Sequence, residues 1–141
     1  MLSVFSLSAA AATDGFEVRS TTVQSTDIDV DGDGKFSQGD KFIFADVLTV
    51  NGKEIGTAGG VCVATRVKSD KDYTNQCVVT YHLPKGQITA QALIDAEDYE
   101  KGEFKDAITG GTDAYKNAGG EILVELIDGG ADLTFFIDDL G

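Results

Sequence analysis

Residues 39–65 read GDKFIFADVLTVNGKEIGTAGGVCVAT and contain the clearest structural signal in the chain. β-Branched and aromatic residues dominate Lys41–Val50, which is typical of a strand. The dipeptide Asn51-Gly52 follows, and this pair supplies the two positive φ angles of a type I′ turn. A second strand-like run starts at Lys53. The stretch therefore predicts a β-hairpin.

Other strand-like runs lie on both sides of this hairpin and are separated by polar or glycine-containing turns. They are Phe16–Thr26, Val61–Lys68, Tyr73–Leu83, Gln87–Asp95, Phe104–Thr109, Glu121–Ile127 and Ala131–Ile137. The charged segment Asp95–Lys105 fits either an irregular loop or a frayed turn of helix. About eight short strands without a convincing amphipathic helix predict an all-β domain, either a closed barrel or a sandwich. An eight-stranded barrel encloses room for one small ligand.

Size and charge limit the possible partners. The chain has 141 residues, which fits one domain, and we expect that domain to span residues 14–141. The formal net charge of −13 repels phosphate backbones and anionic membrane surfaces, so nucleic acid is not an expected partner. No run approaches the roughly 20 apolar residues of a membrane span.

Residues 1–13 contain the apolar run LSVFSLSAAAA, whose alanines resemble the end of a secretory signal with an A-x-A cleavage site. A basic n-region is missing from this run, so a disordered or helical arm explains it equally well. The first interpretation predicts a secreted, extracellular protein. The second predicts a cytoplasmic one.

From Gly39 onward the sequence resembles the allene oxide cyclase and dirigent superfamily. Four pieces carry the resemblance in the right order: GDKFIF (residues 39–44), GTAGGVCV (56–63), LPKGQITAQ (83–91) and AITGGTDAYKNAGGEILVEL (107–126). The resemblance implies a single eight-stranded antiparallel β-barrel. It also implies an interior that binds a hydrophobic small molecule, no cofactor for the chemistry, and assembly into homodimers or homotrimers.

The cyclases of this superfamily hold a short-lived fatty-acid epoxide in a folded conformation while a ring closes, so catalysis comes from positioning and charge stabilisation. Their cavity contains an asparagine, a cysteine, a glutamate and a tyrosine. Asp46 stands at the asparagine position here and Cys62 at the cysteine position, whereas the other two fall near Thr22 and Ile94. Asp46 and Cys62 are therefore the candidate catalytic residues. The candidate wall residues are Phe42, Phe44, Leu48, Tyr81 and Ile94.

Cys62 and Cys77 lie on successive predicted strands joined by a short polar turn. Residues that face each other across such a hairpin are close enough for a disulfide, which we favour. The alternative is a free Cys62 that shapes the cavity wall, because no histidine lies close in sequence to activate it.

Residues 29–40, DVDGDGKFSQGD, have the spacing of an EF-hand calcium loop. Carboxylates at positions one, three and five surround a hard cation, the seventh residue offers its carbonyl, and the twelfth closes the shell. The predicted ligands are Asp29, Asp31, Asp33, Lys35 and Asp40. A polar turn between two strands is the alternative, because strands rather than helices flank the motif.

Three functions follow from these observations. The first is an isomerase or cyclase that folds an apolar oxygenated or polyene substrate inside the barrel, with Asp46 steadying charge. The second is a non-catalytic carrier or dirigent-type binder. The third is a secreted structural protein with a filled barrel. Polar groups that converge on a cavity favour the first function, and a purely apolar cavity favours the second.

Overall fold

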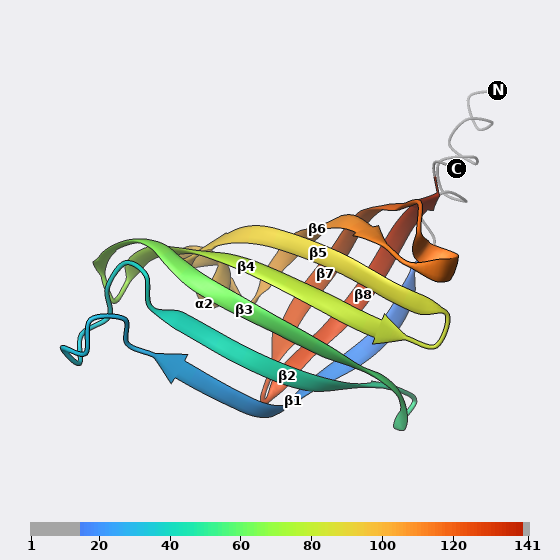
Figure 1. Ribbon diagram of the computed structural model, residues 1–141, viewed down its shortest axis with the longest axis horizontal. Helices are drawn as coiled ribbons and strands as arrows, with labels where there is room; N and C mark the ends of the chain where they lie inside the picture. The colour runs from blue at the N-terminus through green and yellow to red at the C-terminus, as the bar shows by residue number, and fades with distance from the viewer. Residues whose placement is uncertain (1–14, 140–141) are drawn as a thin grey trace.

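A computed structural model describes residues 15–139, and these form a closed barrel of eight antiparallel strands (Figure 1). The elements in chain order are β1 (Phe16–Ile28), β2 (Lys41–Val50), β3 (Lys53–Ser69), β4 (Asp72–Leu83), β5 (Gly86–Asp95), α2 (Ala96–Lys101), β6 (Glu103–Gly111), the 3₁₀ helix η1 (Asp113–Tyr115), β7 (Ala118–Ile127) and β8 (Gly130–Asp139). Every strand pairs with its neighbour in the chain, and β1 pairs with β8 to close the ring. The predicted all-β barrel is confirmed.

The predicted hairpin joins β2 and β3. Asn51 and Gly52 have φ angles of 52° and 79°, as a type I′ turn requires, and Val50 pairs with Lys53. The two runs that the sequence separates at Val61 form one continuous strand, β3, which is the longest in the barrel. Its glycines allow close approach to neighbouring strands without ending the strand.

The interior of the barrel is filled at one end. Leu48, Ile88, Ile122 and Phe135 are completely buried there and form the centre of the hydrophobic core, next to the turns β2–β3 and β4–β5. The acidic loop between β1 and β2 lies at the opposite end, together with α2 (left in Figure 1). The barrel therefore has a packed end and an end where other side chains face inward.

The charged segment that follows β5 contains α2, a helix of six residues that ends at Gly102 with a φ of 79°. Asp95, Glu97 and Glu100 of this segment are exposed, so most of its charge is solvated at the barrel rim. Within residues 15–139, no helix is both long enough and apolar enough to cross a bilayer. The predicted signal or arm at residues 1–13 lies outside the described residues.

Candidate functional site

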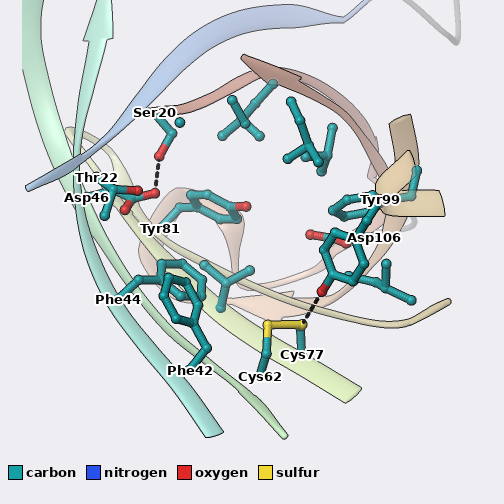
Figure 2. Close-up of a pocket in the computed structure, with 18 residues that line it drawn as sticks. Ser20, Thr22, Phe42, Phe44, Asp46, Cys62, Cys77, Tyr81, Tyr99 and Asp106 are labelled. Atoms are coloured by element: carbon teal, nitrogen blue, oxygen red, sulfur yellow. Dashed lines mark hydrogen bonds between the residues drawn. A yellow bond between two sulfur atoms is a disulfide. The ribbon is translucent and has the colours of Figure 1, made fainter. Parts of the chain in front are cut away.

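A cavity of about 240 Å³ occupies the α2 end of the barrel interior (Figure 2). Its wall consists of inward-facing side chains from β1 to β8 and of one side chain from α2. The lining residues are Ser20, Thr22, Phe42, Phe44, Asp46, Cys62, Cys77, Val79, Tyr81, Ile94, Tyr99, Phe104, Asp106, Val124, Leu126, Gly130, Ala131 and Leu133. Most of this wall is apolar, but hydroxyl and carboxyl groups interrupt it at several points.

Asp46 is the polar group on the β2 wall. Its side chain is only 9% exposed, and one carboxylate oxygen, Oδ2, accepts a hydrogen bond of 2.6 Å from the hydroxyl of Ser20 on β1. The other oxygen, Oδ1, is buried without a hydrogen-bond partner among the described residues. A buried carboxylate oxygen without a partner is costly, so this atom is available to a donor on a bound molecule.

Asp106 is a second carboxyl group, on the β6 wall, and it is 6% exposed. Its Oδ1 also lacks a hydrogen-bond partner within the described part of the chain. Burial penalises the charged form and raises the pKa of Asp106 to about 6. This side chain therefore changes between a proton donor and a proton acceptor close to neutral pH.

Tyr81 projects from β4 into the space between the two carboxyl groups (Figure 2). Its side chain is 4% exposed, and its ring lies edge-on to Phe135 of the packed core with 5.2 Å between the centroids. Burial, followed by the negative charges of Asp106 and Asp46, raises the pKa of the phenol. Tyr81 consequently keeps its proton at physiological pH and acts as a hydrogen-bond donor.

The two cysteines form a disulfide across β3 and β4, at directly opposed positions with 4.0 Å between their Cα atoms. The predicted bridge is confirmed, and the alternative of a free thiol is wrong. Cys62 has therefore no thiolate to offer as a catalytic group, although it does line the cavity. The disulfide sulfur carries no proton, so Tyr99 is the donor in the 3.7 Å contact between its hydroxyl and Cys77 Sγ.

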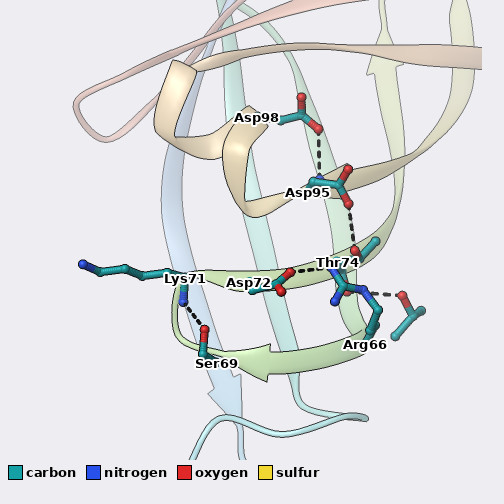
Figure 3. A network of polar contacts seen from close by, with 8 residues as sticks. Arg66, Ser69, Lys71, Asp72, Thr74, Asp95 and Asp98 are labelled. Carbon is teal, nitrogen blue, oxygen red and sulfur yellow. Dashed lines mark hydrogen bonds and ion pairs between the residues drawn. The ribbon is translucent and has the colours of Figure 1, made fainter.

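Polar contacts fix the position of α2 and thereby of Tyr99 (Figure 3). The hydroxyl of Thr74 donates to Asp95 at 2.7 Å, and the backbone N–H of Asp95 donates to Asp98 at 2.9 Å. On the adjacent hairpin, Arg66 donates to Asp72 at 2.7 Å and lowers the pKa of that carboxyl group. The Thr74–Asp95 hydrogen bond joins the start of the helix to β4, and Asn75 Nδ2 donates to the Tyr99 hydroxyl at 3.2 Å, so the Tyr99 ring stays over the cavity.

Several predicted wall residues lie together in the cavity, and one does not. Phe42, Phe44, Tyr81 and Ile94 line it, as do Asp46 and Thr22. Leu48 belongs instead to the packed core at the other end of the barrel.

The sequence interpretation missed three polar lining residues, Ser20, Tyr99 and Asp106. Alternation along β6 contains a signal for one of them, because Phe104, Asp106 and Ile108 share the inward face.

The acidic loop at residues 29–40 lies beside the open end of the cavity. Carboxylate oxygens of Asp29, Asp31 and Asp40 are within 4.8 Å of one another, whereas Asp33 is outside this group and accepts from the backbone N–H of Lys35 at 2.8 Å. A hollow of about 460 Å³ separates the loop from the barrel. This hollow shares the side chains of Phe42 and Cys62 with the interior cavity, so the two spaces adjoin at these residues.

Comparisons with known proteins agree with this architecture. The family model described as "Allene oxide cyclase barrel like domain" matches residues 19–134. A solved structure of "Pyocyanin demethylase" is 31% identical with a TM-score of 0.75, and the match covers 86% of this chain and 98% of that chain.

Two solved structures with lower identity show the fold alone. The Diels-Alderase AbmU from Streptomyces koyangensis is 15% identical with a TM-score of 0.73, over 95% of this chain and 67% of that chain. The pterocarpan synthase dirigent protein GePTS1 is 19% identical with a TM-score of 0.63, and the match covers 85% of this chain and 79% of that chain. No curated protein matches significantly.

Proposed function

Because this chain belongs to the allene oxide cyclase-like barrel family, we propose that it is an enzyme that rearranges a small hydrophobic molecule inside the barrel, as an isomerase or cyclase. The observation that carries the proposal is the convergence of Asp46, Tyr81 and Asp106 on a cavity that is otherwise apolar. A carrier needs only the apolar wall. Buried polar groups with unused hydrogen-bonding capacity are costly for stability and are therefore typical of a reactive site.

The apolar wall supports the positioning part of such a reaction. Phe42 and Phe44 stack on one side with 5.8 Å between their centroids, and Tyr99 meets Phe104 edge-on at 6.0 Å on the other. A flexible or planar guest between these rings loses much of its conformational freedom before it reacts. The volume of about 240 Å³ lies just below the usual range of ligand pockets, roughly 300–1,000 Å³, which suits a compact substrate.

The polar groups support the charge-stabilising part. Asp46, oriented by Ser20, stabilises positive charge on the substrate or accepts a proton from it. The Tyr81 hydroxyl donates a hydrogen bond to an oxygen or nitrogen on which negative charge develops. An isomerisation or ring closure leaves the elemental composition unchanged, so these steps balance without a cofactor or an external oxidant.

A second candidate is the activity that the name of the 31% identical relative describes, removal of a methyl group from pyocyanin. The identity extends over 86% of this chain, which is the observation that favours it. A substrate screen should therefore include pyocyanin, with its loss followed by absorbance.

The test is to purify the folded protein, identify co-purifying small molecules by mass spectrometry, and incubate each with fresh enzyme. We expect an isomeric product of equal mass, and Asp46→Asn and Tyr81→Phe should each slow its formation by about 10²-fold or more. Glu54→Gln removes the same charge as Asp46→Asn from an exposed site beside the packed end and serves as the control.

A ligand that binds and is released unchanged would contradict catalysis and support the carrier function. A product in which hydrogen replaces a methyl group, lighter by CH2 and accompanied by a one-carbon product, would support the second candidate.

The acidic loop is a candidate for a structural calcium ion. Oxygens at 2.3–2.6 Å on opposite sides of Ca²⁺ are about 5 Å apart, which fits the spacing of Asp29, Asp31 and Asp40. The Lys35 carbonyl would occupy the seventh loop position. Calcium should raise the melting temperature of the protein, and Asp31→Asn should abolish that rise, whereas an unchanged melting temperature would contradict the site.

Assembly and location complete the proposal. Ile43, Val78 and Leu93 are 41%, 43% and 63% exposed on the outer faces of β2, β4 and β5, where they form an apolar strip that suits a homodimer or homotrimer. Light scattering of the purified protein measures that assembly. The disulfide suits an extracellular setting, which secretion from a host that expresses the full chain tests.

A further inference from the structure

The two buried carboxyl groups lie on opposite walls of the cavity. Asp46 is on β2 and Asp106 is on β6, and β6 is four strands away from β2 in either direction around a ring of eight. Figure 2 shows them facing each other across the space, with Tyr81 on β4 midway between them. Each has one buried oxygen without a hydrogen-bond partner among the described residues. A molecule that fills the space therefore meets a carboxyl group at each end.

Positive side chains are missing from this cavity. None of the 18 lining residues in the described part of the chain is lysine, arginine or histidine. An anionic ligand such as a fatty-acid carboxylate finds no counter-ion there and meets two carboxyl groups, which is unfavourable in a low-dielectric site. The net charge of −13 on the whole chain also repels anions during approach.

The aromatic side chains complement this charge. Phe42 and Phe44 on β2 lie on the same side as Asp46, and Phe104 on β6 lies on the same side as Asp106. The negative faces of aromatic rings attract cations, with Trp, Tyr and Phe serving this purpose in many sites. Both the rings and the carboxyl groups thus favour positive charge in the guest.

We propose that the ligand of this cavity is a compact aromatic molecule that carries positive charge or hydrogen-bond donors at its two ends, bound lengthwise between Asp46 and Asp106. The inference deepens the proposed function, on which it rests for the cavity being the ligand-binding site. It makes Asp106, which the sequence interpretation missed, a ligand-binding residue. It also narrows the small hydrophobic substrate of the proposed function to a nitrogen-containing or otherwise donor-rich one.

The direct test is isothermal titration calorimetry at pH 7.5 with three two-ring probes of similar size. They are 6-amino-1-methylquinolinium, which is cationic with donors at the far end, neutral 2-methylquinoline, and anionic 2-naphthoate. We expect the cation to bind most tightly and the anion most weakly. Asp106→Asn should weaken binding of the cation by about tenfold or more, because a hydrogen bond to a buried charge is lost.

Glu103→Gln is the matched control, since it removes one negative charge from the exposed face of the same strand. It should leave all three affinities unchanged. Equal binding of the three probes, tighter binding of the anion, or no binding of any probe would overturn the inference. An equal loss of cation affinity in both variants would overturn it as well, because that result would reflect only net charge.

A pH series adds an independent readout. The groups that face Asp106 are Tyr81 from β4, Tyr99 from α2 and Asp46 from β2, and burial raises the pKa of both tyrosines so that they stay neutral. With the Asp106 pKa at about 6, binding of the permanent cation should strengthen from pH 5 to pH 7.5 in the native protein. The increase should be smaller in Asp106→Asn, and identical pH profiles would contradict the proposal.

These results separate the inference from the proposed catalysis. Cation-selective binding without turnover of any co-purified compound would leave the inference standing and contradict the enzyme. Turnover of an anionic substrate would do the opposite.

Discussion

Replacing Asp106 with asparagine should change how the stability of the barrel depends on pH. Burial raises the pKa of this carboxyl group from its ordinary 3.8 to about 6 in the folded protein. Below pH 3.8 the group is protonated in both folded and unfolded chains and costs nothing. Between pH 3.8 and 6 only the folded chain keeps the proton, so the free energy of unfolding falls as pH rises, and above pH 6 the full cost of the buried charge applies.

The magnitude follows from the difference between the two pKa values. A tenfold change in proton affinity corresponds to about 1.4 kcal/mol, so the full cost of the buried charge is about 3 kcal/mol. The unfolded group is already partly ionised at pH 4, so the native protein should lose roughly 2 kcal/mol of this between pH 4 and pH 7. Asp106→Asn lacks this loss. Its amide adds a constant offset that does not vary with pH, so the change with pH is the diagnostic quantity.

Urea unfolding of the ligand-free protein, followed by circular dichroism at pH 4, 5, 6, 7 and 8, measures this change. The arginine partners of Asp72 and Asp132 lower the pKa values of these two carboxyl groups, which therefore stabilise the fold above their unfolded pKa values. This contribution is the same in the native protein and in Asp106→Asn, so it cancels in the difference between the two curves. Glu103→Gln should follow the native curve. Parallel curves for Asp106→Asn and the native protein would refute the argument that burial perturbs this carboxyl group.

Two further changes test the cavity wall and one tests the loop. Gly60→Ala should lower the free energy of unfolding by about 1–3 kcal/mol and weaken ligand binding, because a Cβ there meets the Phe44 ring and lies 2.8 Å from the Val78 carbonyl oxygen. Gly59→Ala is the control, because a Cβ there has no atom nearer than 4.0 Å, and urea unfolding should find its stability almost unchanged. Reducing the disulfide should cost about 3 kcal/mol for a loop closed over 15 residues, which unfolding with and without dithiothreitol measures. Calcium, but not magnesium, should raise the melting temperature through the acidic loop, in a calorimetric scan against a chelator control.

Much of the fold could be predicted from local sequence signals. Asn51-Gly52 fixed the β2–β3 hairpin because only a type I′ turn uses two successive positive φ angles well. The pairing of Cys62 with Cys77 followed from the short turn between their strands. Local signals of this kind act over a few residues, so they are legible without knowledge of distant partners.

The candidate site was harder to predict because it depends on contacts between strands that are distant in sequence. Asp106 faces Asp46 only after the ring closes, and β6 reaches its place opposite β2 through the intervening pairings. Tyr99 comes from an acidic segment that reads as solvated surface, and the hydrogen bonds that hold α2 at the rim are not visible in the sequence. Leu48 was assigned to the wrong end of the barrel. The alternation of side chains along β2 predicts that it points inward, but not at which end of the interior it lies.

The packing of one end of the barrel has a kinetic consequence. That end is blocked by the side chains of Leu48, Ile88, Ile122 and Phe135. A ligand therefore enters and leaves through the opposite opening, beside Phe42. A bulkier side chain at that opening should therefore lower the association and dissociation rates by the same factor and leave the equilibrium affinity unaltered. A cavity with one opening also lets each product block the next substrate, so product release becomes the rate-limiting step of the catalytic cycle.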